Sequence, residues 1–180
     1  MRKLQSSEIF IELLNSKKHS SGGATFYPMA DTYTQIYLHV VFAVKGRLNL
    51  IDKSHKDELY KYITGIITNA GQKLIAINGM PDHVHLLIGL KPSMNLSDLI
   101  RDVKANSSRF INEKRWVLGK FEWQHGFGAF SYSHSQLNVI IAYIQNQEDH
   151  HRTQTFREEY IQLLERFEID FKSKYIFDEI

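Results

Sequence analysis

The segment INGMPDHVHLLIGL (residues 77–90) decides the fold, because it contains two apolar β-type runs joined by Pro81-Asp82, a typical turn pair. It therefore predicts a β-hairpin. Side chains alternate between the two faces of a strand, so His83 and His85 project from the same face. Two imidazoles at this spacing can bind one cation together. A pair of hydrogen-bonded histidines at the entrance of a buried strand is the alternative interpretation.

The hydrophobic pattern on either side of the hairpin predicts an antiparallel sheet with helices. Strands are expected at 33–44, 73–80 and 83–90, with a short fourth strand inside 121–133. Helices are expected at 52–70, 96–111, 136–151 and from Thr155, which opens a capping box with Glu158. The order β, α, β, β, α, β, α, α resembles the ferredoxin-like arrangement. The expected class is α+β, an antiparallel sheet with helices packed on one face.

The N-terminal part of the chain differs in composition from the rest. Residues 1–28 contain a short amphipathic run followed by NSKKHSSGG, which is flexible-linker chemistry. We expect an N-terminal extension at 1–28 and one domain at 29–180. The basic start has no long apolar core, so a secretory signal is not predicted.

Composition excludes several classes of protein. There is no cysteine, which rules out disulfides and thiolate metal sites and suits a reducing compartment, so a cytoplasmic location is expected. No apolar run of about 18 residues is present, so no membrane span is predicted. The net charge of +2 permits a nucleic-acid partner without arguing strongly for one.

The predicted helix at 136–151 offers partners for the histidine pair. Tyr143 and Gln147 are four residues apart and therefore stack on one flank of this helix. A phenol can act as a nucleophile, and an amide oxygen can coordinate a hard cation. Together with His83 and His85, the amide makes an imidazole–imidazole–oxygen set that suits Mg²⁺ or Mn²⁺ acting on a phosphate.

Basic and aromatic residues supply weaker candidates for DNA contact. Arg101, Lys104 and Arg109 can bind backbone phosphates, or they can be the solvated surface of a helix. The aromatic segment WQHGFGAFSY (123–132) can stack unpaired bases, or it can form core or a dimer interface. Both interpretations stay open for each set.

Three polar residues near the candidate site also have two interpretations each. Asp82 is either a turn residue or a partner that orients a histidine. His150 and His151 either help to bind metal or DNA, or interact favourably with the C-terminus of their helix. The turn and helix-end roles are the simpler ones.

Five ordered segments resemble a known family. They are PDHVHLLIGL, LSDLIRDVKANSSRFI, WQHGFGAFSYS, YIQNQEDHH and FREEY. In this order they resemble the small single-tyrosine transposases of bacterial insertion sequences, which belong to the HUH nucleases, named for His-hydrophobe-His. The resemblance covers about residues 29–170.

The resemblance implies an activity and a role for each site residue. His83 and His85 correspond to the metal-binding pair, Tyr143 to the nucleophile and Gln147 to the third metal ligand. The implied reaction uses Mg²⁺ or Mn²⁺ to polarise a phosphodiester of single-stranded DNA, and yields a 5′-phosphotyrosine and a free 3′-hydroxyl. The implied partners are DNA hairpins at the element ends and a second copy of the chain. The tyrosine helix then acts on its own chain or across the dimer.

Two other functions remain open from the sequence. One is a single-stranded nucleic-acid binding module without catalysis, which explains the sheet and the aromatics but gives the histidines no shared purpose. The other is a domesticated relative with an intact site that acts on host DNA repeats. No HExxH motif or carboxylate cluster supports a simple metallohydrolase.

Overall fold

The computed structural model describes residues 33–172 and residue 176. The predicted extension at 1–28 lies outside these residues, and the domain division stays a prediction. In the described part, the elements are β1 (Tyr37–Ala43), the 3-10 helix η1 (Lys45–Arg47), α2 (Lys53–Asn69), β2 (Lys73–Met80), β3 (His83–Gly89), α3 (Leu96–Lys114), β4 (Gly128–Tyr132), the 3-10 helix η2 (His134–Gln136), α4 (Leu137–Gln145), α5 (Gln147–His150) and α6 (Phe156–Arg166). None of these helices is long and apolar enough to cross a membrane.

The sheet has four strands in the order β2-β3-β1-β4, and every neighbouring pair is antiparallel. This is the ferredoxin-like strand order, so the predicted α+β class is confirmed. β3 is an interior strand and is buried along its whole length apart from its last residue. The register places His85 opposite Val41 and His83 opposite Ala43. The histidine pair therefore lies in the middle of the sheet rather than at an edge.

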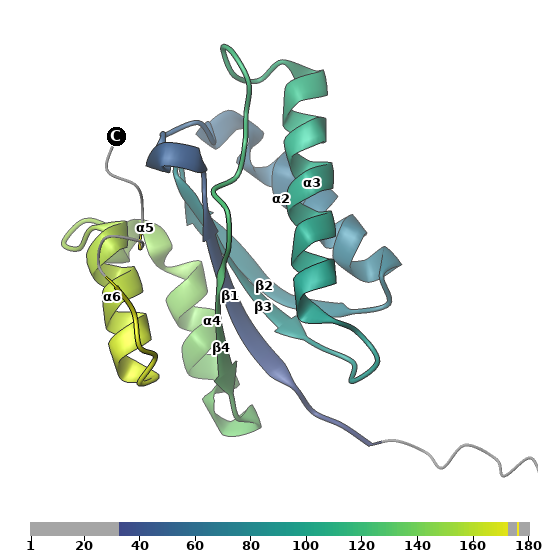
Figure 1. Cartoon of the computed structure of the whole chain (residues 1–180), viewed down its shortest axis with the longest axis vertical. Coiled ribbons are helices and arrows are strands. Elements are labelled where there is room, and N and C mark those ends of the chain that lie inside the picture. Colours follow the sequence, from purple (N-terminus) through teal and green to yellow (C-terminus); the bar gives the residue numbers. More distant parts are fainter. Residues whose placement is uncertain (1–32, 173–175, 177–180) are drawn as a thin grey trace, which may run out of the picture. The chain divides into compact units, whose positions relative to one another are not determined.

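Helices cover both faces of the sheet (Figure 1). As expected, α2 and α3 cover one face, where Leu86 and Ile88 of β3 enter the larger core. The structure adds a second layer, because α4 and α6 pack on the other face around Leu87 and Phe130. The reason is that β1 and β3 are apolar at consecutive positions, so both of their faces have to be buried. His83, His85 and Leu87 occupy alternate positions along β3, so their side chains point to the same face of the sheet, which α4 and α6 cover.

Local signals explain how the hairpin and the last helix are placed. Gly79 lies opposite Val84 in the hairpin, and a Cβ at this position would lie 2.2 Å from the carbonyl oxygen of His83. Only glycine therefore lets β2 approach β3 this closely beside the first histidine. The predicted capping box at Thr155 and Glu158 is present and starts α6.

The helix predicted at 136–151 is wrong in one respect. The 3-10 helix η2 leads directly into α4, and the helical run then breaks at Asn146, which separates α4 from α5. Tyr143 lies in the last turn of α4, whereas Gln147 is the first residue of α5. After the break α5 packs against β2, and Gln147 lies in a fully buried position.

Candidate active site

The histidine pair of β3 is fully buried and oriented by polar partners. His83 Nδ1 lies 2.7 Å from Asp82 Oδ1, so the imidazole N–H donates to the carboxylate. His85 Nδ1 lies 2.9 Å from Nε2 of His39, a fully buried residue of β1. Asp82 thus orients a histidine as well as standing in the turn. A ring nitrogen anchored in this way leaves Nε2 free to face the site.

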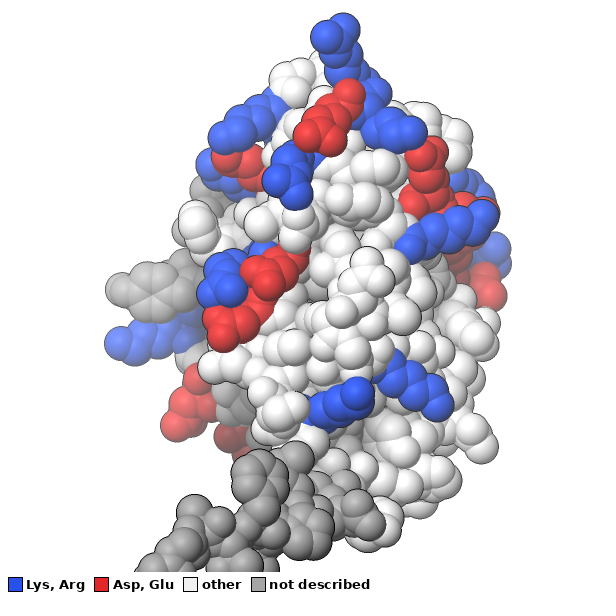
Figure 2. Space-filling model, turned by 90° about the vertical axis from the view of Figure 1, so that its right-hand side faces the viewer, with Lys and Arg blue, Asp and Glu red and all other residues white. Residues whose placement is uncertain are grey.

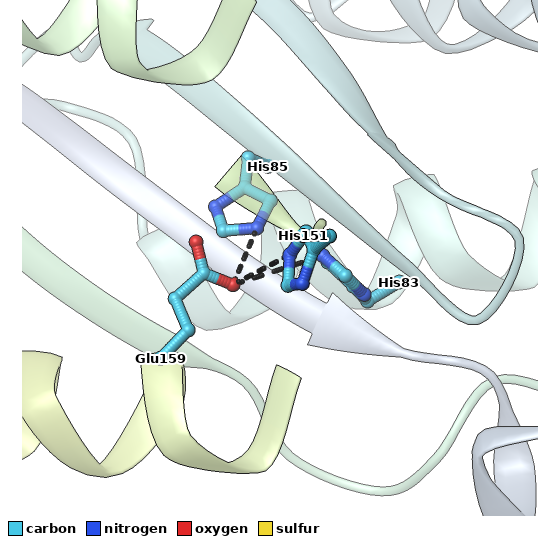
Figure 3. A group of neighbouring side chains, drawn as sticks. All are labelled: His83, His85, His151 and Glu159. Carbon is cyan, nitrogen blue, oxygen red and sulfur yellow. Dashed lines mark ion pairs between the residues drawn. The ribbon is translucent and has the colours of Figure 1, made fainter. Parts of the chain in front are cut away.

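A third imidazole and a carboxylate join this pair (Figure 3). His151, at the end of α5, donates through Nδ1 to the Gln154 carbonyl at 2.9 Å. Glu159 of α6 points its carboxylate at the three rings, with Oε2 3.1 Å from His151 Nε2 and 3.4 Å from His85 Nε2. One ligand atom from each of these residues, His83 included, lies within 4.8 Å of all the others. Four donor atoms this close together could hold one metal ion.

Gln147 enters the same site from α5. Its Oε1 lies 3.0 Å from His151 Nε2 and 3.4 Å from His83 Nε2, and its Nε2 donates to Glu159 Oε1 at 3.0 Å. The side chain is fully buried. The structure therefore brings the predicted amide oxygen next to the predicted histidine pair. It adds His151, whose metal-binding interpretation was left open by the sequence, and Glu159, which the sequence analysis did not single out.

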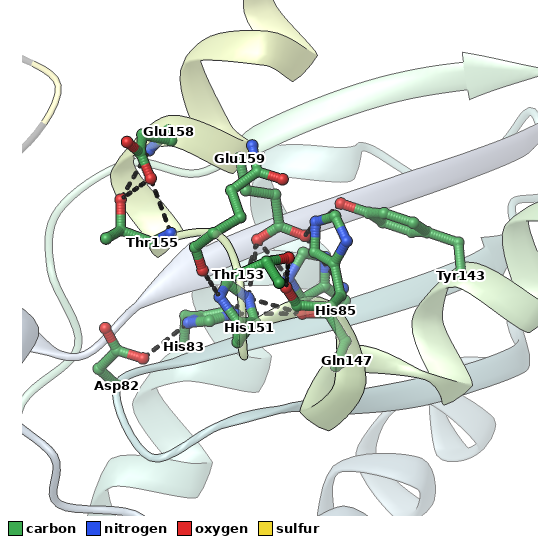
Figure 4. A network of polar contacts seen from close by, with 12 residues as sticks. Asp82, His83, His85, Tyr143, Gln147, His151, Thr153, Thr155, Glu158 and Glu159 are labelled. Atoms are coloured by element: carbon green, nitrogen blue, oxygen red, sulfur yellow. Dashed lines mark hydrogen bonds and ion pairs between the residues drawn. The ribbon is translucent and has the colours of Figure 1, made fainter.

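Tyr143 approaches the site from α4 (Figure 4). Its hydroxyl donates a hydrogen bond to Glu159 Oε1, the same oxygen that accepts from Gln147. The phenol ring lies edge-on to His85, with centroids 6.1 Å apart. A cavity of about 140 Å³ opens beside Tyr143 and Glu159 and is also lined by His150 and Arg166. The phenol and the histidine pair thus meet within one chain.

The electrostatics of the site favour a bound cation. Burial lowers the pKa of His85 to about 4 despite the nearby Glu159 carboxylate, so this imidazole is neutral at neutral pH. Burial alone would raise the pKa of Glu159, but the nearby imidazoles of His151 and His85 outweigh it, and the net pKa is well below normal. Burial and then the Glu159 charge raise the pKa of Tyr143. The site thus holds an ionised carboxylate, neutral imidazole and a protonated phenol.

The basic DNA candidates lie on α3, on the other side of the sheet. Arg101 is exposed and pairs with Asp98 at 2.5 Å, and Lys104 donates to the Gly126 carbonyl at 2.7 Å. Both line a cavity of about 580 Å³, and Arg109 is exposed outside it. Figure 2 shows basic side chains interspersed with acidic ones on the face that it presents, around a broad uncharged area. DNA contact by these three residues stays a prediction.

The aromatic segment contributes mainly to the core. Trp123 and Phe130 are 7% and 1% exposed, and the Trp123 indole N–H donates to Ser107 Oγ at 2.9 Å. Phe127 is partly buried against the same core. Stacking of bases on Trp123 or Phe130 would require these side chains to leave the core.

An interior-strand His-hydrophobe-His pair on a ferredoxin-like sheet, faced by a helical tyrosine, defines the class of single-tyrosine HUH transposases. Residues 32–147 match the model of the family described as "Transposase IS200 like". The chain therefore belongs to the IS200-like transposases, which are metal-dependent DNA endonucleases and strand transferases. The predicted family is confirmed.

Individual relatives agree with this assignment. The chain is 28% identical over 122 residues to the ISDra2 transposase TnpA of Deinococcus radiodurans, covering 64% of this chain and 86% of that protein. A crystal structure of a chain assigned as a transposase from D. radiodurans R1 superimposes with a TM-score of 0.51 at 25% identity, covering 71% of this chain and 98% of that one. A REP-associated tyrosine transposase bound to a REP hairpin gives a TM-score of 0.53 at 15% identity, over 70% and 74% of the two chains, and shows likeness of fold.

Proposed function

We propose that this transposase cleaves and rejoins single-stranded DNA at insertion-sequence ends, with Tyr143 as the nucleophile. In this proposal His83, His85 and Gln147 hold a divalent cation, Mg²⁺ or Mn²⁺. One observation supports it above all: the Tyr143 hydroxyl and the Nε2 atom of His85 approach the two oxygens of a single buried carboxylate, Glu159. A phenol and a neutral imidazole placed this close can act on one phosphodiester.

The reaction follows from the groups present. The Tyr143 oxygen attacks the phosphorus, and the bond from phosphorus to the 3′-oxygen of the preceding nucleotide breaks. The phenol gives up its proton in this step, and one proton is taken up by the departing oxygen, which leaves as a 3′-hydroxyl. The new bond is a 5′-phosphotyrosine. The bound cation supplies Lewis-acid stabilisation of charge on the phosphate oxygens. Attack by a 3′-hydroxyl of another strand reverses the step, so strands are rejoined without ATP.

The protonated state of the phenol explains why a cation is needed. Tyrosine has a reference pKa of about 10, and the pKa of Tyr143 is raised further by burial and by Glu159. The phenol is thus a weak nucleophile in the free protein. It becomes reactive when positive charge is present beside it, which links cleavage to occupancy of the metal site.

The partners proposed are hairpin-bearing single-stranded DNA and a second copy of the chain. Tyr143 lies beside the histidines of its own chain, which supports assembly of the site within one subunit. The homodimer and exchange of the tyrosine helix between subunits stay predictions. A domesticated relative would use the same site on hairpins of host DNA repeats, and a cytoplasmic location suits both kinds of DNA substrate.

The test is adduct formation by the whole protein. It is incubated with single-stranded oligonucleotides from the flanking genomic ends and Mn²⁺, and the products are separated in denaturing gels. We expect a protein–DNA adduct that survives denaturation and disappears when a chelator is added. Binding that is insensitive to the chelator, with no cleavage of any strand, would instead indicate a non-catalytic binding module.

A further inference from the structure

The three histidines of the site share one arrangement. In each ring, Nδ1 is held by a group outside the cluster, and Nε2 faces Glu159. The outer groups are Asp82 for His83, His39 for His85 and the Gln154 carbonyl for His151. Metal-bound histidines in proteins are commonly oriented in this way by a partner on the other ring nitrogen. His151 is therefore oriented for metal binding in the same way as the two histidines of β3.

Glu159 is buried among these rings, and its two oxygens differ. Oε1 accepts hydrogen bonds from Tyr143 and Gln147. Oε2 lies 3.1 to 3.8 Å from the three Nε2 atoms, and it has no hydrogen-bond partner among the residues that the structure describes. Nε2 of His85 likewise lacks a hydrogen-bond partner there. The Glu159 side chain is 1% exposed, so Oε2 is not solvated and meets the three imidazoles at ion-pair distances.

Buried polar atoms without partners require an explanation, and a missing ion is one of the few available. A divalent cation among the four residues would give both atoms a ligand bond. It would also balance the buried carboxylate without requiring protonated histidines. The imidazoles alone do not supply these two atoms with hydrogen bonds. Glu159 Oε2 lies 3.4 Å from His85 Nε2, but the geometry is not that of a hydrogen bond.

We propose that Glu159 and His151 are ligands of the divalent cation that His83 and His85 hold. This inference rests on the proposed function and extends its ligand set to three imidazoles and a carboxylate, with Gln147 as a further oxygen donor. Such a set favours Mn²⁺ and other first-row transition metals over Mg²⁺, which prefers oxygen ligands and retained water. Through its two oxygens, Glu159 also joins the cation to the Tyr143 hydroxyl.

The experiment measures metal binding by the whole protein without DNA. Mn²⁺ is titrated calorimetrically into wild type, Glu159→Gln and His151→Asn. Loss of an outer partner of a metal site commonly weakens binding about 10–100-fold, so loss of a direct ligand is expected to weaken it by about 100-fold or more. The matched controls are Glu165→Gln, an exposed residue of the same helix, and His134→Asn, an exposed histidine of η2, both with unchanged affinity.

Two outcomes separate this inference from the proposed function. If His85→Asn loses Mn²⁺ but Glu159→Gln and His151→Asn bind as wild type, the added ligands are wrong and the histidine pair stands. If His85→Asn also binds as wild type, the proposed metal site itself is wrong. Far-UV circular dichroism checks the fold of each variant. Because a variant can fail to fold, pulsed electron paramagnetic resonance of Mn²⁺ on wild type counts the imidazoles: three support the inference, and two overturn it.

Discussion

Replacing Tyr143 with phenylalanine is expected to abolish the covalent protein–DNA adduct, with a fall of at least about 10³-fold, because the attacking oxygen is gone. The ring itself remains, so its packing against His39 and His85 is retained. The lost interaction is the hydrogen bond to Glu159, and hydrogen bonds to charged groups contribute about 1.5–3 kcal/mol. The variant should therefore fold and bind DNA hairpins almost as wild type does. Adduct yield is measured in denaturing gels and hairpin binding by mobility shift.

The matched control for this variant is Tyr62→Phe. Tyr62 belongs to α2 on the opposite face of the sheet, where its ring stacks on Phe110 at 4.1 Å. The Tyr62→Phe variant also loses a phenolic hydroxyl, but Tyr62 lies outside the site. Its adduct yield should therefore equal that of wild type. Adducts that persist in Tyr143→Phe would show that another residue is the nucleophile.

The second large effect is expected from His85→Asn. Removing one ligand of the pair should lower adduct yield by about 100-fold or more at limiting Mn²⁺. Mutation of a residue that only orients a metal ligand already lowers metal affinity or activity by about 10–100-fold. A large excess of Mn²⁺ should restore part of the yield, because the remaining donors still bind the ion weakly. Adduct yield is followed across a Mn²⁺ titration, with His134→Asn as the control.

The Mn²⁺ titration distinguishes this effect from misfolding. An unfolded or misfolded variant does not recover with added metal, and its circular dichroism spectrum differs from that of wild type. Wild-type yield at limiting Mn²⁺ in His85→Asn would contradict the assigned metal pair. If a chelator left the adduct yield of wild type unchanged, metal dependence itself would be contradicted.

Much of the fold could be predicted because its signals are local. The hairpin is defined by β-type residues on both sides of Pro81-Asp82, and the structure places β2 and β3 at those residues. The capping box at Thr155 likewise starts α6 as expected, and of the two possible caps for α2, Asp52 and Ser54, the structure uses Asp52. Such signals depend on nearby residues alone, so no tertiary information is needed.

Which helices form the second layer, and where the helix breaks, could not be predicted in the same way. The sequence of a buried strand is apolar whichever helices cover it. The residues of β3 therefore do not show that α4 and α6 lie on its second face. Asn146 is an ordinary helical residue by pattern, and the break there reflects contacts of α5 with β2. Both features are set by tertiary packing.

Glu159 shows why the site itself was only partly predicted. The spacing of His83 and His85 and the four-residue offset of Tyr143 and Gln147 are visible in the sequence. Glu159 is 74 residues after His85 and lies in a charged helical segment, FREEY, where an acidic residue is normally solvated. Only its burial to 1% exposure identifies it. A carboxylate on the apolar flank of α6 was the one available signal.

The most direct measurement identifies the residue that carries the DNA. The adduct formed with a short single-stranded oligonucleotide and Mn²⁺ is digested with protease and nuclease, and the modified peptide is sequenced by tandem mass spectrometry. The account predicts a nucleotide 5′-phosphate on the phenolic oxygen of Tyr143. A phosphate attached to any other residue, or at a 3′ end, would contradict it.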